Sequence, residues 1–240
     1  MLQSSKFHTH WVQFAPFVRG AVLDATTMRG PAYRKLYPFF DRRKSMTDTL
    51  GTDKTGNPAP LGLMGFAMTT ILLNLHNVGF IPLDMMILSV GIFYGGLAQV
   101  LAGAMEWKKG NTFAATAFVS YGMFWLSLVA IVVMPKSGWG VAAPGGYAMP
   151  AYLFMWGLFS LVLYFGTLRL NRALQVVFGS LVVLFWLLAV ADAVGSGSIA
   201  KVAGWIGLFC GFSAMYTGLA QVLNEVYGKT VWPLGPVVRK

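Results

Sequence analysis

Charged residues and cysteine are both scarce in this sequence. Only 11% of its 240 residues are charged, whereas 56% are apolar. Soluble domains usually carry about 25% charged residues, so this composition predicts that lipid surrounds most of the chain. The single cysteine, Cys210, excludes an intramolecular disulfide and a cysteine-rich metal site.

Sequence signals of catalysis and of secretion are also missing. There is no glycine-rich phosphate loop and no convincing nucleophile with its base, and two of the three histidines, His8 and His10, lie near the N-terminus. We therefore expect no enzyme activity, no cofactor and no metal. Residues 1–25 are interrupted by Arg19 and Asp24 and lack the compact apolar core of a cleavable signal peptide.

The net charge of +10 is concentrated in one part of the chain. Nine of the 18 lysines and arginines fall in residues 1–60, before the first long apolar run. In a soluble protein such a charge would suggest nucleic acid, but this segregation argues against a nucleic-acid partner. We divide the chain into a basic cytosolic extension (1–56), a transmembrane domain (57–230) and a cytosolic tail (231–240).

Six apolar runs follow the extension, at 61–80, 83–105, 111–134, 150–168, 173–192 and 199–224. Each is near the ~20 residues that a helix needs to cross a bilayer. These solid runs lack the alternation of a membrane β-barrel, so only helices can satisfy the backbone in lipid. The predicted fold class is an all-α membrane protein whose six transmembrane helices form three hairpins.

The distribution of basic residues predicts the orientation of these helices. With the N-terminus inside, the inside segments hold the nine early basic residues and seven later ones, sixteen in all. The outside loops hold two, Lys136 and Lys201. The positive-inside rule therefore predicts that the N- and C-termini are both cytosolic. We expect a multi-pass protein of the cell membrane, either inner or plasma membrane.

A six-residue string, GLAQVL, occurs twice, at 96–101 and 218–223. Both copies lie on helices that return to the cytosol, and a weaker match, YFGTLR, begins at Tyr164 on the third such helix. Three related hairpins would surround an axis, and a protomer pore would run along it. The alternative is that the glycines of these strings only let neighbouring helices pack closely.

Polar residues inside a membrane span are costly and should face a cavity or a partner. In the first span, six residues recur at helical spacing and form a stripe that is polar except at two positions: Phe66, Thr69, Thr70, Leu73, Asn74 and Asn77. We interpret the stripe as a pore wall interrupted by an apolar plug. Alternatively, the threonines bond to their own helix backbone, and the asparagines lie at the outer interface.

Two further features each allow two interpretations. Tyr121 and Trp125 lie one turn apart on the third span, where they form either the helix core or a gate. Glu106 closes the second span near the cytosolic side. It is either a proton site or a solvated partner of Lys108 or Lys109.

Four stretches carry a resemblance to a known family. They are NPAPLGLMGFAMTTILLNLHNVGF (57–80), GIFYGGLAQVLAGAMEWKKGNTF (91–113), SYGMFWLSLVAIVVMPK (120–136), and the region from AGWIGLFCG to VLNEVYGKTVWP (203–233). Together they resemble the acetate uptake transporter family, the succinate–acetate permeases, whose hallmark is the string NPAPLGL. The likeness covers nearly all of 57–235, and residues 1–56 lie outside it.

The resemblance implies a six-helix protomer that assembles as a homohexamer in the bilayer. It implies transport of small carboxylates, chiefly acetate and in some members succinate. It also implies a hydrophobic constriction, which by local motif falls on Phe66, Tyr121 and Leu181. At ~1.5 Å per residue these three lie about 10–15 Å into spans one, three and five, so they would form a ring at one depth. Such a ring gates by dewetting.

On either side of this ring we expect groups that line the path and bind a carboxylate. They are Thr69, Thr70, Asn74, Gln99, Trp125, Gln221 and the Tyr121 hydroxyl. Asn57, as the cap of the first helix, would direct free N–H groups at the cytosolic mouth. Glu106 is the candidate proton site.

The mode of action stays open at this stage. A passive anion channel and a proton symporter both fit the sequence. A non-transporting membrane sensor or scaffold, acting through the basic N-terminal tail, is the alternative from another functional class.

Overall fold

The computed structural model of the chain describes residues 55–237. The predicted extension therefore lies outside the described residues except for its last two. In chain order the described elements are α3 (Ala59–Asn77), α4 (Met85–Val90), the π-helix η2 (Gly91–Ala98), α5 (Gln99–Lys108), α6 (Thr112–Val133), the 3₁₀ turn η3 (Met134–Lys136), α7 (Ala148–Thr167), α8 (Arg172–Ala193) and α9 (Gly197–Val226).

The elements α4, η2 and α5 form one continuous helix, Met85–Lys108. With it, the described part of the chain has six helices that are long and apolar enough to cross a membrane. Their ends fall within a few residues of the six apolar runs, so the all-α fold with six transmembrane helices is confirmed. Among the described residues, β pairing is limited to a single bridge between Asn171 and Pro236.

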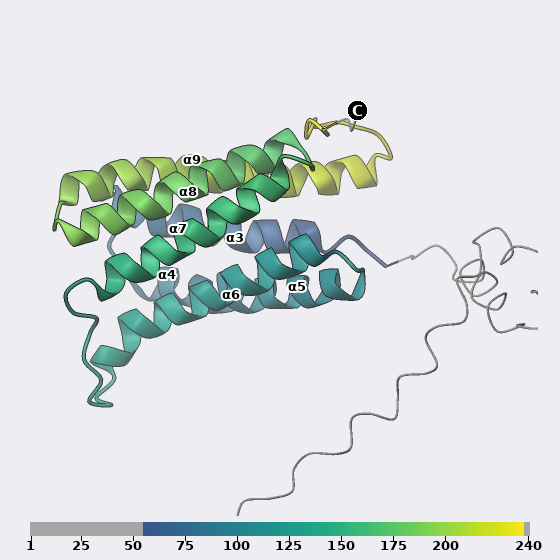
Figure 1. Cartoon of the computed structure of the whole chain (residues 1–240). Helices are drawn as coiled ribbons and strands as arrows, with labels where there is room; N and C mark the ends of the chain where they lie inside the picture. The colour runs from purple at the N-terminus through teal and green to yellow at the C-terminus, as the bar shows by residue number, and fades with distance from the viewer. Residues whose placement is uncertain (1–54, 238–240) are drawn as a thin grey trace, which may run out of the picture. The chain divides into compact units, whose positions relative to one another are not determined.

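The outward helix of each hairpin packs against the returning helix of another hairpin (Figure 1). α6 packs along η2 and α5, and α8 packs along α7. α3 packs along α9, the last helix, and this contact brings the two ends of the domain together. The three hairpins are thus linked in a cyclic order, as the repeat in the sequence predicts.

The two ends of this bundle differ in the residues that they carry. The basic end holds the starts of α3, α6 and α8, together with Lys108, Lys109, Arg169, Arg172 and Lys229. The opposite end holds the loops at 78–84, 137–147 and 194–196.

Glycines make the close contacts between helices possible. A Cβ atom on Gly122 of α6 would lie 2.8 Å from the carbonyl oxygen of Gly96 and 3.0 Å from the amide nitrogen of Val100. In the two GLAQVL copies, Gly96 faces Leu126 of α6 and Gly218 faces Leu63 of α3. The repeated glycines therefore tighten helix packing, the alternative that the sequence left open.

Asparagine side chains begin two of the helices at the basic end. Asn111 accepts a hydrogen bond from Ala114 N at the start of α6, and Asn171 accepts one from Leu174 N at the start of α8. The start of α3 differs from expectation, because Pro58 holds the cap position and Asn57 lies one residue earlier. Asn57 Oδ1 still accepts a hydrogen bond from Ala59 N at 3.1 Å.

The substitution Gly122→Ala should lower the thermal stability of the detergent-solubilised protein. The added methyl group meets backbone atoms of the neighbouring helix, which cannot move aside, and overpacking of this kind costs about 1–3 kcal/mol. Gly197→Ala is the matched control, because no atom lies within 4 Å of its added Cβ. Equal melting temperatures for the two variants would contradict this account of the α5–α6 contact.

Candidate functional site

Two cavities enter the helix bundle from its two ends. The basic-end cavity has a volume of about 560 Å³ and is lined by α3, α5, α6, α8 and α9 together with Leu170, Asn171 and Leu234. The opposite-end cavity has a volume of about 420 Å³ and is lined by α3, α4, α6, α7 and α8 and the start of α9. Both are lined mostly by apolar side chains.

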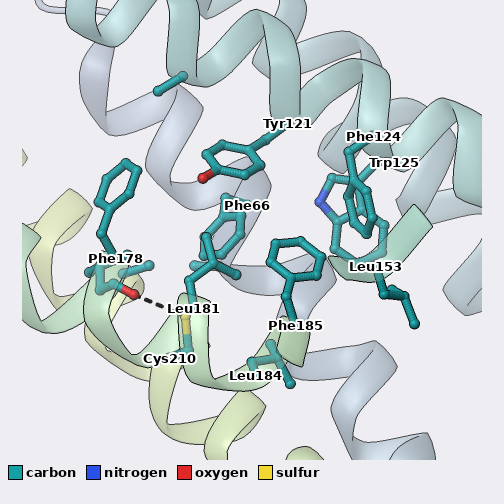
Figure 2. Close-up of a cluster of buried hydrophobic side chains, with 14 of the residues drawn as sticks. Phe66, Tyr121, Phe124, Trp125, Leu153, Phe178, Leu181, Leu184, Phe185 and Cys210 are labelled. Atoms are coloured by element: carbon teal, nitrogen blue, oxygen red, sulfur yellow. Dashed lines mark hydrogen bonds between the residues drawn. The ribbon is translucent and has the colours of Figure 1, made fainter. Parts of the chain in front are cut away.

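A layer of buried apolar side chains separates the two cavities. On the basic side it presents Phe66, Tyr121 and Leu181, which are 7%, 3% and 2% exposed. Figure 2 shows these three turned toward one another from α3, α6 and α8. The ring centroids of Phe66 and Tyr121 lie 5.9 Å apart. The three residues predicted as a constriction are therefore neighbours in one apolar cluster.

The layer is deeper than the three predicted residues. On its other side Phe124, Trp125 and Leu153 line the opposite-end cavity, and Phe185 packs edge-on against Phe124 with ring centroids 5.2 Å apart. Phe178 lines the basic-end cavity and contacts Tyr121 at 6.2 Å between ring centroids. Figure 2 shows the aromatic rings of this layer gathered between the surrounding helices.

The hydroxyl group of Tyr121 is already engaged. It lies 2.8 Å from Ser160 Oγ, and Ser160 donates its own proton to the carbonyl oxygen of Trp156. Tyr121 is therefore the donor of the pair, so in this arrangement its hydroxyl has no proton to offer a carboxylate. Its contribution to the layer is the ring.

Gln99 has a buried amide without a partner. The side chain is 1% exposed and lines the basic-end cavity. Neither its Nε2 nor its Oε1 atom makes a hydrogen bond within the described part of the chain. A buried amide without partners costs about 1–3 kcal/mol, so the hydrogen-bonding capacity of this amide is unused within the described residues.

Gln221, the counterpart of Gln99 in the second GLAQVL copy, is placed differently. Its Oε1 accepts a hydrogen bond of 3.0 Å from Asn57 Nδ2, and its Nε2 donates to the carbonyl oxygen of Thr217. Gln221 and Asn57 both line the basic-end cavity. Identical strings therefore hold two glutamines of which one is satisfied and the other is not.

Glu106 is buried at the basic end, with an exposed fraction of 3%. Its Oε2 atom accepts a hydrogen bond of 2.8 Å from Asn111 Nδ2. Glu106, Lys109 and Asn111 all line the basic-end cavity. Asn111 and Lys109 were not among the predicted site residues. The position of Asn111 directly before the run TFAAT is a helix-cap signal that could have identified it.

The predicted stripe of α3 divides between the cavities and the neighbouring helices: Phe66 lines the basic-end cavity and Leu73 and Asn77 line the opposite-end cavity, whereas the others face neighbouring helices. Thr69 donates to the carbonyl oxygen of Gly65, and Asn74 donates to that of Thr70. Thr69 lies against Gly95, and Asn74 lies against Gly207. These two residues and Thr70, all buried, are not among the residues that line the two cavities.

Trp125 supplies an unpartnered donor on the far side of the layer. Its side chain is 4% exposed and lines the opposite-end cavity. Its indole N–H makes no hydrogen bond within the described part of the chain. Each cavity is therefore lined by one residue whose buried N–H donor has no partner within the described residues. Within residues 55–237, no three His, Cys, Asp or Glu side chains gather as a metal site requires.

Comparison with known proteins identifies relatives of this chain. The model of the "GPR1/FUN34/yaaH family" matches residues 43–235. The "Succinate-acetate/proton symporter SatP" of Escherichia coli K12 is 59% identical over 186 residues, which are 78% of this chain and 98% of the relative. "Acetate permease A" of Emericella nidulans is 38% identical over 190 residues, 72% of this chain and 63% of the relative.

One solved structure, described as that of "the bacterial acetate channel SatP", matches with a TM-score of 0.74 and 59% sequence identity. The match covers 76% of this chain and all of the solved one. The six-helix arrangement described above is thus shared with a protein of known structure.

The substitution Gln99→Met should stabilise the protein by about 1–3 kcal/mol, since it replaces an unpartnered buried amide by an apolar side chain of similar length. Thermal unfolding in detergent measures the change. Gln175→Met is the control, because the Gln175 amide donates to Thr167 O and accepts from Arg172. A loss of stability in Gln99→Met would contradict the description of this amide as unsatisfied.

Proposed function

Because this chain belongs to the GPR1/FUN34/yaaH family, we propose that it carries small carboxylates, chiefly acetate, across the plasma membrane. The path runs through the two cavities and across the layer of Phe66, Tyr121 and Leu181. Succinate is a second substrate, since the relative from Escherichia coli is named for both acids. The function is transport without catalysis.

The observation that carries the proposal is the pair of cavities that approach one apolar layer from opposite ends of the bundle. A closed layer of Phe, Tyr and Leu side chains excludes water, and hydrated inorganic ions cannot shed their water there without a large cost. A carboxylate with a methyl group loses less hydration free energy in the layer, because part of its surface is apolar. The layer therefore favours small organic acids over inorganic anions.

Polar groups next to the layer bind the carboxylate on each side. At the basic end Gln99 offers a free amide N–H, and Lys109 lines the same cavity. The starts of α3, α6 and α8 add the positive ends of three helix dipoles. Beyond the layer, Trp125 offers its indole N–H. Asn57 and Gln221, bonded to each other, form the outer wall of the basic-end cavity.

The remaining predicted residues take supporting roles in this proposal. Thr69 and Asn74 hold α3 against its neighbours, since they bond to their own helix and pack on glycines. Thr70 is buried beside them, and its hydroxyl has no partner within the described residues. The basic end faces the cytosol, as the distribution of lysine and arginine predicts. The protein works as a homohexamer with one path in each protomer.

Uptake of labelled acetate into proteoliposomes tests the proposed function directly. We expect acetate uptake above that of protein-free vesicles at alkaline pH, where nearly all acetate is ionised and leakage of the neutral acid is low. Unlabelled succinate should compete with acetate. Uptake equal to that of protein-free vesicles would overturn the proposal and favour a role in signalling.

The substitution Phe66→Ala should weaken the selectivity of the path. Removal of the ring opens the layer to water, so the ratio of chloride flux to acetate flux should rise about tenfold. Phe154→Ala is the control, since Phe154 is 52% exposed and lines neither cavity. An unchanged ratio of chloride flux to acetate flux in Phe66→Ala would show that Phe66 does not contribute to the selectivity.

The substitution Glu106→Gln separates proton symport from passive anion conduction. We propose that Glu106 carries the coupled proton, because it is buried, lines the path and is bonded to a neutral amide. Acetate uptake by the wild-type protein should then increase with an inward proton gradient and be insensitive to a potassium diffusion potential. Glu106→Gln should lose the response to the proton gradient. Uptake that follows the electrical potential in both proteins would instead identify an anion channel.

A further inference from the structure

The chain beyond α9 returns to the bundle and closes one side of the basic-end cavity. We call residues Val231–Val237 the C-terminal strap. Its carbonyl oxygens at Leu234 and Gly235 accept hydrogen bonds of 3.1 and 2.8 Å from Ala173 N and Arg172 N. These two N–H groups belong to the first turn of α8, where a helix has no internal acceptors. The strap therefore completes the cap of α8.

A second set of contacts holds the strap to α9. Asn224 Oδ1 accepts hydrogen bonds from Val231 N and Trp232 N at 2.7 and 2.9 Å, and Asn224 Nδ2 donates to Trp232 O at 2.8 Å. The ring of Trp232 stacks on Tyr216, with centroids 5.4 Å apart and planes 7° from parallel. The Asn224 side chain thus makes three hydrogen bonds, all to strap backbone.

Leu234 is the strap residue that reaches the path. It lines the basic-end cavity, and it also lines an outer groove of about 520 Å³ that contains Arg172, Val176, Phe209 and Phe212. Leu234 therefore borders both the cavity and the outer groove. Truncation of this side chain would join the two spaces and widen the mouth of the cavity.

We propose that the C-terminal strap limits the size of the carboxylates that enter at the basic end. Leu234 is the residue that determines this limit, and Asn224 is a positioning residue that holds Leu234 in place. This inference rests on the proposed function, because it assigns a selectivity element to that same path. The apolar layer rejects inorganic ions, and the strap rejects bulky organic acids before they reach the layer.

The accessibility of the cavity to thiol reagents tests the strap without measuring transport. Ala117, which lines the cavity at 3% exposure, is replaced by cysteine. The native Cys210 is buried. The modification rate of the protein without Ala117→Cys gives the background from this native cysteine. In the Ala117→Cys variant, we compare the modification rates of a bulky aromatic methanethiosulfonate and of the small methyl reagent. Adding Leu234→Ala should raise the bulky-to-small rate ratio about tenfold. Leu168→Ala is the matched control, since Leu168 is 39% exposed and lines none of the three spaces.

Variants of Asn224 test the strap independently of any change at Leu234. Asn224→Ala removes all three side-chain bonds and should raise the rate with the bulky reagent as Leu234→Ala does. Asn224→Asp keeps the acceptor for the N–H groups of Val231 and Trp232, so it should give an intermediate rate. A bulky-to-small rate ratio that is unchanged in Leu234→Ala and Asn224→Ala overturns the proposal.

Flux measurements then connect the strap to substrate choice. In proteoliposomes, Leu234→Ala should raise the ratio of benzoate flux to acetate flux, whereas Leu168→Ala should leave it unchanged. If the wild-type protein carries no acetate, the proposed function fails, but the modification rates still show whether the strap closes the cavity. If acetate flux is normal and both ratios are unchanged in Leu234→Ala, only the role of the strap fails.

Discussion

The contact between Phe66, Tyr121 and Leu181 is the constraint on which the rest of the structure depends. These side chains come from three helices, and they can meet only if α3, α6 and α8 all lie toward the interior of the bundle. The glycines of α5 and α9 allow those helices to approach α6 and α3 closely. The Tyr121 hydroxyl, bonded to Ser160 of α7, fixes the orientation of its ring. Close packing between helices is therefore what keeps the two cavities apart.

Polar groups near this contact follow a consistent pattern. Most are satisfied within the protein: Thr69 and Asn74 bond to their own helix, and Gln221 bonds to Asn57 and Thr217. The exceptions in the cavities are Gln99 and Trp125, whose donors are buried and unpartnered within the described residues. Proteins tolerate a buried donor without a protein acceptor mainly where a ligand or an ordered water accepts its hydrogen bond. For this reason Gln99 and Trp125 are the residues to which the proposed function assigns carboxylate binding.

The ends of the path are built differently from its middle. The middle consists of side chains on long helices, whose positions are determined by packing along their whole length. The basic end consists of helix starts, the Glu106–Asn111 pair and the C-terminal strap, which is held mainly by backbone hydrogen bonds and by Asn224. Under the proposed function the apolar layer discriminates between ions and organic acids, and the strap at the mouth discriminates by size. The two proposed kinds of selectivity would then depend on different residues of one path.

The sequence by itself determined the six spans, because the length and hydropathy of a helix in lipid depend only on neighbouring residues. The family resemblance indicated Phe66, Tyr121 and Leu181, and helical rise predicted that the three lie at a similar depth; the structure shows that they are neighbours in one cluster. Only the tertiary structure decided which polar groups are free. Gln99 and Gln221 stand in identical strings, yet only Gln221 meets Asn57, which is 164 residues away in the chain. Ser160, 39 residues from Tyr121, accepts a hydrogen bond from its hydroxyl, and Leu234, which lines the cavity, belongs to a strap that bonds to Asn224 and to the start of α8. Hydrogen bonds between distant residues leave no local pattern, and for that reason they had to be read from the packed structure.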